Sequence, residues 1–299
     1  MLEENWLWAV FTIAAALAQT LRNATQRGLT ATLGTVGATH VRFLFGLPFA
    51  LIFLAVVAIA TGVPLPNPSP AFWPWIVIAT LGQIAATALM LAAMNERSFV
   101  VAIAYIKTEP VQVALFGVVF LGDRITLPIA VAILVATAGV VLMSVRPGTI
   151  AAGGNRPALL GISAGATFAF SAVAYRGAIL SLDTPSYVMA ATFTLAVGLA
   201  IQASLLSLYL AIRDRAVLRN IVRSWRPSLA AGFLGALASQ FWFLAFALAT
   251  AASVRTLALV EVLFAQAIST FVFHQKVTPR ELIGMLLVVA GVALLLWAH

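Results

Sequence analysis

Long apolar segments alternate with short polar connections along the whole chain of 299 residues. A helix needs about 20 mostly apolar residues to cross a bilayer. By this criterion the pattern predicts ten spanning helices, at residues 6–26, 34–60, 71–94, 98–121, 126–145, 157–180, 186–211, 228–250, 252–273 and 279–297. The connections between them are too short for a soluble domain. The sequence therefore predicts an all-α membrane protein.

The composition supports this prediction and narrows the possible functions. The chain is 63% hydrophobic and 9% charged, whereas soluble domains carry about 25% charged residues. The net charge of +8 is spread over the connections, which favours membrane orientation over nucleic-acid binding. The expected partners are the lipid bilayer and a small-molecule substrate, and nothing requires an oligomer.

Signals of an enzyme are absent from the sequence. There are no cysteines, the three histidines are far apart, and neither a zinc-protease motif nor a phosphate-binding loop occurs. We therefore expect no catalytic residues, no metal and no cofactor. ATP is not expected to drive the protein directly.

A faint internal repeat divides the chain. Adding 152 to the numbering places Glu109 on Glu261, Thr126 on Thr278, and residues 138–140 on residues 290–292. We predict a first five-helix repeat at 1–150 and a second at 151–299, joined through the connection at 146–156. Because five is odd, the second repeat would cross the membrane in the inverted sense, as in many secondary transporters.

Short motifs carry a family resemblance. Glu109-Pro110, then Leu121-Gly122-Asp123 and Gly139-Val140, resemble the repeat of the EamA-type branch of the drug/metabolite transporter superfamily. The second half departs from the family pattern at two motifs. Val262 replaces the proline, and residues 273–275 replace Leu-Gly-Glu. The first span has no acid, so the proton exchange of small multidrug antiporters is not carried over.

The resemblance implies an exporter that works by alternating access in the inner or plasma membrane. Within the family the chain is most similar to exporters of amino acids, aromatic ones included. The alternative is an exporter of drugs or other metabolites. A membrane-embedded enzyme would need a cluster of histidines or acids, and a channel would need polar faces on several spans.

Three charges lie about ten residues into their predicted spans, namely Lys107, Glu109 and Glu261. A charge at that depth costs about 2.5–3.5 kcal/mol, so it needs a partner or a polar cavity. Lys107 and Glu109 are about 200° apart on one helix and cannot face each other. We predict that Lys107 pairs with Glu261 and that Glu109 faces the cavity. Pro110 is expected to kink the helix beside it.

Further polar and aromatic residues complete the predicted cavity. Tyr105 and Gln112 share a helical face with Glu109, and Gln83 and Trp242 lie at mid-depth elsewhere. The predicted cavity residues are thus Gln83, Tyr105, Glu109, Gln112, Trp242 and Glu261. Core packing is the alternative for Trp242, and a purely structural ion pair is the alternative for the deep charges. Three arginines nearer to span ends are expected to reach the headgroups: Arg42, Arg176 and Arg255.

Basic residues in the connections predict the orientation. Twelve lie on one side and only Arg124 lies on the other. The twelve are Arg22, Arg27, Arg97, Arg146, Arg156, Arg213, Arg215, Arg219, Arg223, Arg226, Lys276 and Arg280. The positive-inside rule then puts both termini outside the cytoplasm, although members of the resembling family usually have cytoplasmic termini. The basic connection at 212–226 would face anionic headgroups.

Cysteine labelling tests this orientation. A single cysteine at Asn220 should resist an impermeant thiol reagent in intact cells, whereas one at Pro68 should react, because the chain has no other cysteine. Labelling at Asn220 with none at Pro68 would reverse the orientation.

Overall fold

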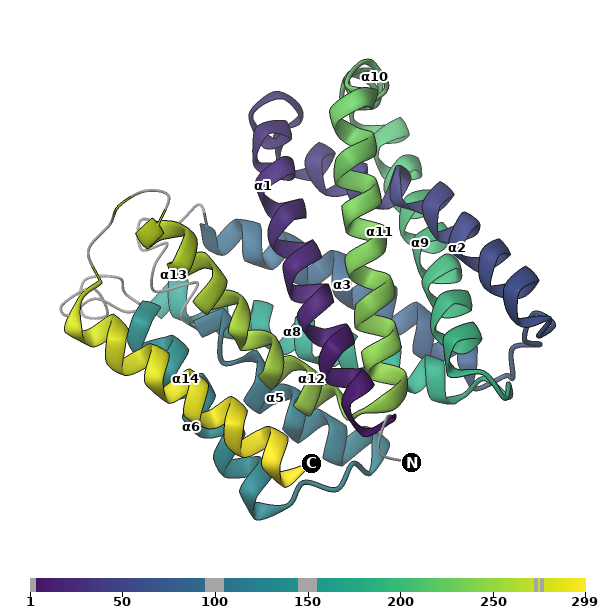
Figure 1. Ribbon diagram of the computed structural model, residues 1–299. Coiled ribbons are helices and arrows are strands. Elements are labelled where there is room, and N and C mark those ends of the chain that lie inside the picture. Colours follow the sequence, from purple (N-terminus) through teal and green to yellow (C-terminus); the bar gives the residue numbers. More distant parts are fainter. Residues whose placement is uncertain (1–3, 95–104, 145–154, 272–273, 275–276) are drawn as a thin grey trace. The chain divides into compact units, whose positions relative to one another are not determined.

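The structure is a computed structural model that describes residues 4–94, 105–144, 155–271, 274 and 277–299, and no strand occurs among them (Figure 1). The helices are α1 (Glu4–Leu44), α2 (Gly46–Thr61), α3 (Phe72–Met94), α5 (Glu109–Phe116), the π-helix Gly117–Leu121, α6 (Leu127–Ser144), α8 (Asn155–Leu180), α9 (Tyr187–Arg213), α10 (Arg215–Arg223), α11 (Trp225–Leu248), α12 (Ala251–Leu257), the 3₁₀-helix Ala258–Val260, α13 (Glu261–Phe271) and α14 (Pro279–Ala298). Residues 98–104, 272–273 and most of the 146–156 connection lie outside the described residues.

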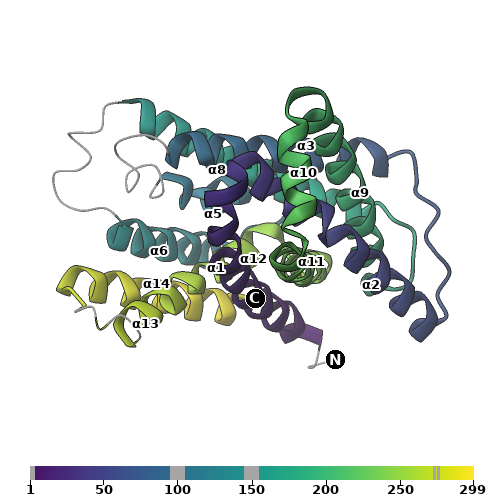
Figure 2. The ribbon, with the colours of Figure 1, turned by 90° about the horizontal axis from the view of Figure 1, so that it is seen from above.

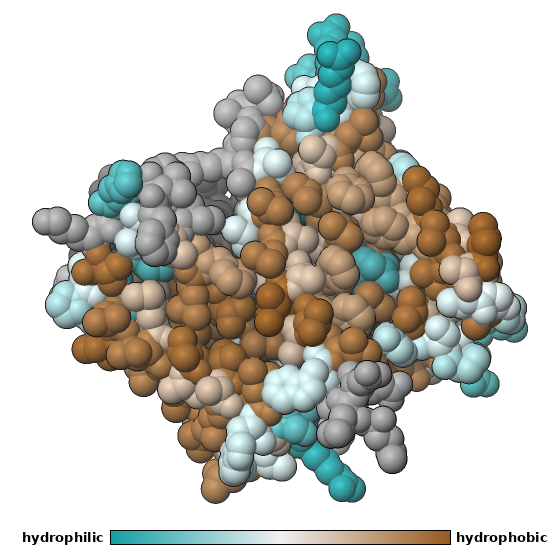
Figure 3. Space-filling view, in the orientation of Figure 1, coloured by the Kyte–Doolittle hydropathy of each residue, from teal (hydrophilic) through white to brown (hydrophobic). Residues whose placement is uncertain are grey.

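Membrane-spanning character is evident over most of the predicted spans. Among the described residues, seven helices are long and apolar enough to cross a bilayer, and Trp6–Arg22 and Glu109–Leu121 are shorter apolar helices. The ninth predicted span is divided between α12, the 3₁₀-helix and α13. The all-α membrane protein is therefore confirmed, while the count of ten spans stays a prediction. Large apolar residues remain on the surface, such as Ile59, which is 84% exposed, and Figure 3 shows one face that is mostly apolar.

One predicted connection is wrong, and another contains a short helix. Residues 27–33 are helical, because α1 continues to Leu44 and is interrupted only at Gly34, whose φ of 66° and ψ of 177° suit glycine alone. The connection at 212–226 contains the helix α10. The proline-rich connection at 61–70 has no helix over residues 62–69, as predicted.

The helices pack into two compact units, each of which takes segments from both predicted repeats. Unit 1 comprises Met1–Leu81 and Ala174–Ala249, and unit 2 comprises Gly82–Val173 and Thr250–His299. In unit 1, α1 lies along α11 and α2 lies along α9 (Figure 1). In unit 2, α6 and α14 lie side by side in both ribbon views (Figure 2).

Small residues in unit 1 bring long helices together. A Cβ atom on Gly232 of α11 would lie 2.5 Å from the Cβ atom of Phe45, and one on Gly177 of α8 would lie 2.7 Å from the Trp75 ring. Close approach of this kind is the usual way in which spanning helices associate, because lipid offers no hydrophobic driving force between them.

Equivalent glycines of the repeat join α6 to α14 in unit 2. A Cβ atom on Gly139 would lie 2.6 Å from the Gly284 carbonyl oxygen and 2.8 Å from the Val288 nitrogen. One on Gly291 would lie 2.9 Å from the Ala132 carbonyl oxygen and 2.6 Å from the Ala136 nitrogen. The repeat offset of 152 residues relates Gly139 to Gly291, and it relates Gly284 and Val288 to Ala132 and Ala136. The two glycines therefore make equivalent contacts. A two-fold relation between these two helices produces this exchange, which gives the sequence repeat a structural counterpart.

Alanine at the two equivalent glycines tests this packing. Gly139→Ala and Gly291→Ala should each destabilise the protein by about 1–3 kcal/mol, because the added methyl group meets backbone atoms of the facing helix. The thermal unfolding midpoint of the purified protein in detergent measures the change. Gly46→Ala is the matched control, since its Cβ atom would have no heavy atom nearer than 3.4 Å. Midpoints equal to that of the control would contradict the close contact.

Candidate functional site

The helix that holds Lys107 and Glu109 is interrupted between them. Tyr105 and Ile106 are helical, Lys107 and Thr108 form a turn, and α5 then begins at Glu109. Pro110 follows in the first turn of α5, where a missing N–H group costs nothing. Over the described part of the predicted span at 98–121, one helical segment therefore ends and another begins here. The disturbance lies beside Pro110, as expected, and takes the form of a turn rather than a kink.

A second interruption lies at the equivalent place in the other repeat. Ala258–Val260 form a 3₁₀-helix, and α13 begins directly afterwards at Glu261. Glu109 and Glu261, which the 152-residue offset equates, are thus both the first residue of a helix. At Glu261 the backbone stays in the right-handed helical region, and its N–H group donates to the Ala258 and Leu259 carbonyls. Interrupted helices with charged ends are typical of substrate sites in secondary transporters.

Two ion pairs in unit 2 hold the deep charges. Lys107 Nζ contacts Glu261 Oε1, so the pair expected from the sequence is present. Arg255 Nε lies 3.2 Å from Glu109 Oε1. Glu109 therefore already has a cationic partner, which the sequence pattern did not indicate.

The expectation that Arg255 reaches the headgroups is wrong. Its helix α12 packs against α5 within unit 2, and Arg255 in the last turn of α12 meets Glu109 at the start of α5. Sequence depth alone could not reveal this contact, because it depends on where the neighbouring helix lies. Arg42 and Arg176 also bond within unit 1, to the Ser239 hydroxyl at 3.4 Å and the Ala249 carbonyl at 2.8 Å.

All four charged side chains of these pairs remain partly accessible. The exposed fractions are 26% for Lys107, 20% for Glu261, 19% for Arg255 and 17% for Glu109. The paired atoms Glu109 Oε1 and Arg255 Nε are themselves buried. A charge in the hydrocarbon region normally faces a partner or a polar cavity and not lipid. We call Lys107, Glu109, Arg255 and Glu261 the charge cluster.

Side chains of unit 2 brace the turn before α5. Gln112 Nε2 donates to Thr108 Oγ1 at 3.0 Å, and the Thr108 hydroxyl donates to the Tyr105 carbonyl at 2.7 Å. Tyr105 and Gln112 are half-buried, and Gln83 is half-buried on α3 in the same unit. Five of the six predicted cavity residues therefore belong to unit 2. Thr108 was missed, although it is a polar residue in an apolar stretch and could have been noticed on that ground.

Trp242 belongs to unit 1, unlike the other predicted cavity residues. Trp242 is 5% exposed, and its ring nitrogen donates a hydrogen bond to Gln19 Oε1 at 3.3 Å. Its ring is stacked with that of Phe246, with 6.4 Å between the ring centroids. These contacts favour the core-packing alternative for this residue. Within the described ranges, no group of three or more metal-ligating side chains occurs.

Comparisons with known proteins find a family match and a shared fold over most of the chain. The EamA-like transporter family matches residues 6–145 and 155–297, one match for each predicted repeat. A solved structure described as "Crystal structure of protein" superposes with a TM-score of 0.71 over 96% of this chain and 95% of the other, at 15% identity. At that identity the likeness shows a shared fold. No curated protein matches the chain.

Charge removal tests the Lys107–Glu261 pair. Lys107→Met and Glu261→Gln should each lower the yield of folded protein, because a lone buried charge costs about 3–5 kcal/mol. The double variant should recover the yield. Size-exclusion chromatography of the detergent-extracted protein gives the folded fraction, and Arg215→Gln on an exposed surface is the control. A double variant no better than the worse single variant would contradict the pair.

Proposed function

Because the chain belongs to the EamA-like transporter family, we propose that it is a secondary transporter that exports a small zwitterionic metabolite, best an amino acid. The family makes it a multi-pass membrane transporter. The substrate, the alternating-access mechanism, the inner-membrane location and the inverted repeat belong to the proposal.

The composition of the charge cluster carries this proposal. It contains two cations and two carboxylates, arranged as two pairs in one unit. A site whose own charges cancel accepts a solute of zero net charge with the smallest electrostatic cost. An amino acid has this net charge and offers one group of each sign.

The two pairs suit different roles. Glu109 and Arg255 lie 3.2 Å apart, and a zwitterion can exchange with this pair, with its ammonium group on Glu109 and its carboxylate on the Arg255 guanidinium. The planar guanidinium binds carboxylates in two-point fashion. Lys107 and Glu261 join the turn before α5 to the start of α13, so we assign this pair to holding the interrupted helices together. Alternating access would expose the exchanging pair to each side in turn.

The alternative substrate is a drug or another metabolite with a single positive charge. A cation bound at Glu109 would displace Arg255 and leave it without compensation, at a cost of about 3–5 kcal/mol. This cost favours the zwitterion. An aromatic preference would depend on Tyr105, because the contacts of Trp242 in unit 1 already account for its burial.

Counterflow in liposomes tests the proposal. Proteoliposomes loaded with one unlabelled amino acid should accumulate its labelled form transiently and saturably, which a channel cannot produce. A panel of neutral, cationic and anionic amino acids and of cationic drugs should favour the neutral zwitterions. Preference for a monovalent cation would support the alternative substrate.

Variants of the cluster separate the two assigned roles. Glu109→Gln leaves Arg255 without its ion-pair partner, so its folded yield should fall as it does for the other single variants. The transport rate of its folded fraction should fall by about tenfold to a hundredfold, the value of a lost hydrogen bond to a charged group. Glu109→Asp keeps the charge and is the matched control, with a smaller loss. The double variant Lys107→Met with Glu261→Gln should keep transporting. Full transport by Glu109→Gln, or none by the folded double variant, would overturn the assignment.

A further inference from the structure

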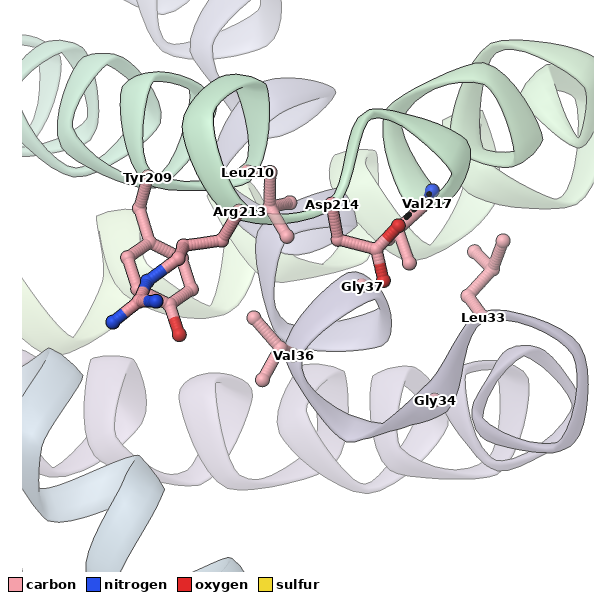
Figure 4. Close-up of a pocket in the computed structure, with 9 residues that line it drawn as sticks. All are labelled: Leu33, Gly34, Val36, Gly37, Tyr209, Leu210, Arg213, Asp214 and Val217. Atoms are coloured by element: carbon pink, nitrogen blue, oxygen red, sulfur yellow. Dashed lines mark hydrogen bonds between the residues drawn. The ribbon is translucent and has the colours of Figure 1, made fainter.

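A pocket of about 410 Å³ opens beside the end of α9, entirely within unit 1 (Figure 4). It is separate from the charge cluster, which belongs to unit 2. Its lining residues come from α1, from the last turn of α9 and from the start of α10: Leu33, Gly34, Val36, Gly37, Tyr209, Leu210, Arg213, Asp214 and Val217.

Packing of three helices forms this pocket. α1 turns at Gly34, where φ is 66°. Beyond the turn, α10 lies so close to α1 that a Cβ atom on Gly37 would be 2.8 Å from Val217 Cγ1. Buried Ile221 of α10 packs in one apolar cluster with Leu29 and Leu33 of α1. Buried Leu33, Gly37 and Leu210 thus form the packed side of the pocket, and its other side is open.

The polar groups of the pocket suit an anion. Tyr209 and Arg213 are one turn apart on α9 and so share a face, and Figure 4 shows both side chains extending together, away from Asp214. Asp214 Oδ1 accepts the Val217 backbone N–H at 3.2 Å as the N-cap of α10. Its negative charge is thus compensated by the helix terminus. Arg213 and the Tyr209 hydroxyl are left to bind a phosphate oxygen.

The surroundings of the pocket point to a lipid as the source of that anion. Residues 213–226 hold five arginines, all exposed, and one acid. Trp225 is 49% exposed, with the Arg226 guanidinium 5.4 Å from its ring. Arg213 is also the last residue of a candidate span, Tyr187–Arg213, so the pocket lies at the depth of the headgroups. Figure 3 shows hydrophilic residues gathered over α10, above an apolar surface.

Exposed apolar residues also adjoin the pocket residues on α1 and α9. Ile212 is 73% exposed and Val36, which lines the pocket, is 43% exposed. An acyl chain can lie along these residues while its headgroup occupies the hollow.

We propose that this pocket binds the headgroup of one anionic phospholipid, with its phosphodiester on Arg213 and Tyr209 and its acyl chains along Val36 and Ile212. The net positive charge of residues 213–226 selects an anionic lipid over a zwitterionic one. The site does not depend on which solute the protein transports.

Native mass spectrometry of the purified full chain tests the proposal. After delipidation, added phosphatidylglycerol should be retained as a single adduct under conditions that remove phosphatidylcholine and phosphatidylethanolamine. Arg213→Gln should weaken retention about fivefold, the effect of one basic residue near an anionic headgroup, and Tyr209→Phe should weaken it less. Arg223→Gln is the matched control, because Arg223 is also an exposed arginine but does not line the pocket, and it should change retention less than twofold. Val36→Trp should abolish the adduct, because the larger side chain fills the pocket while every arginine is kept.

Four results would overturn the proposal. Equal weakening by Arg213→Gln and Arg223→Gln, or normal retention by Val36→Trp, would mean that the lipid is held by diffuse surface charge. Retention of the zwitterionic lipids as strong as that of phosphatidylglycerol would remove the selectivity. Displacement of phosphatidylglycerol by an equal concentration of glycerol phosphate or inorganic phosphate would assign the pocket to a soluble phosphate.

Discussion

A charged side chain in the hydrocarbon region needs an opposite charge or water, and the arrangement of unit 2 follows from this requirement. Lys107 pairs with Glu261 and Arg255 pairs with Glu109, so the interrupted segments of two spans are joined by charge. A helix break also frees backbone groups that lipid cannot satisfy. The Thr108 hydroxyl bonds the Tyr105 carbonyl, and Gln112 in turn bonds Thr108. Charge pairing and turn bracing therefore occur at the same place.

The same constraint relates structure to transport. In the proposed function, the side chains of the charge cluster, which are 17–26% exposed, exchange partners with a solute instead of only fastening helices. The energetic cost of separating Glu109 from Arg255 is small only when an incoming molecule replaces both charges. This condition links the geometry of the site to the charge of its substrate. It is also the basis on which we propose different roles for the two ion pairs.

Close helix contact is the second constraint, and it acts through glycine. Spanning helices have no hydrophobic drive to associate, so backbone proximity and van der Waals contact decide which pairs form. Gly139 and Gly291 provide this contact between α6 and α14 in unit 2, and Gly232 and Gly177 provide it in unit 1. The glycines of unit 2 are equivalent in the repeat, so one local sequence feature is used twice in the same interface.

The sequence by itself determined the membrane class, the repeat and the residues of the deep charges. Apolar segments of spanning length indicate a membrane protein. Each forms a helix, because a helix satisfies all the backbone groups of a single segment in lipid. The Lys107–Glu261 pair could be predicted as well, since two residues on opposite sides of one helix each need a partner elsewhere. The predicted starts of most spans agree with the helices, as at Leu127 and Pro279.

Only the tertiary structure decided which neighbours these residues meet. The helix break before Glu109, the continuation of α1 through residues 27–33, and the Arg255–Glu109 pair all depend on contacts between segments distant in sequence. Hydrophobic periodicity does not encode such contacts, because an arginine near a span end has the same pattern whether it reaches water or a carboxylate. The burial of Trp242 against Gln19 was decided in the same way. The sequence therefore gives the depth of a residue along its span. The packing of neighbouring helices decides which way its side chain points.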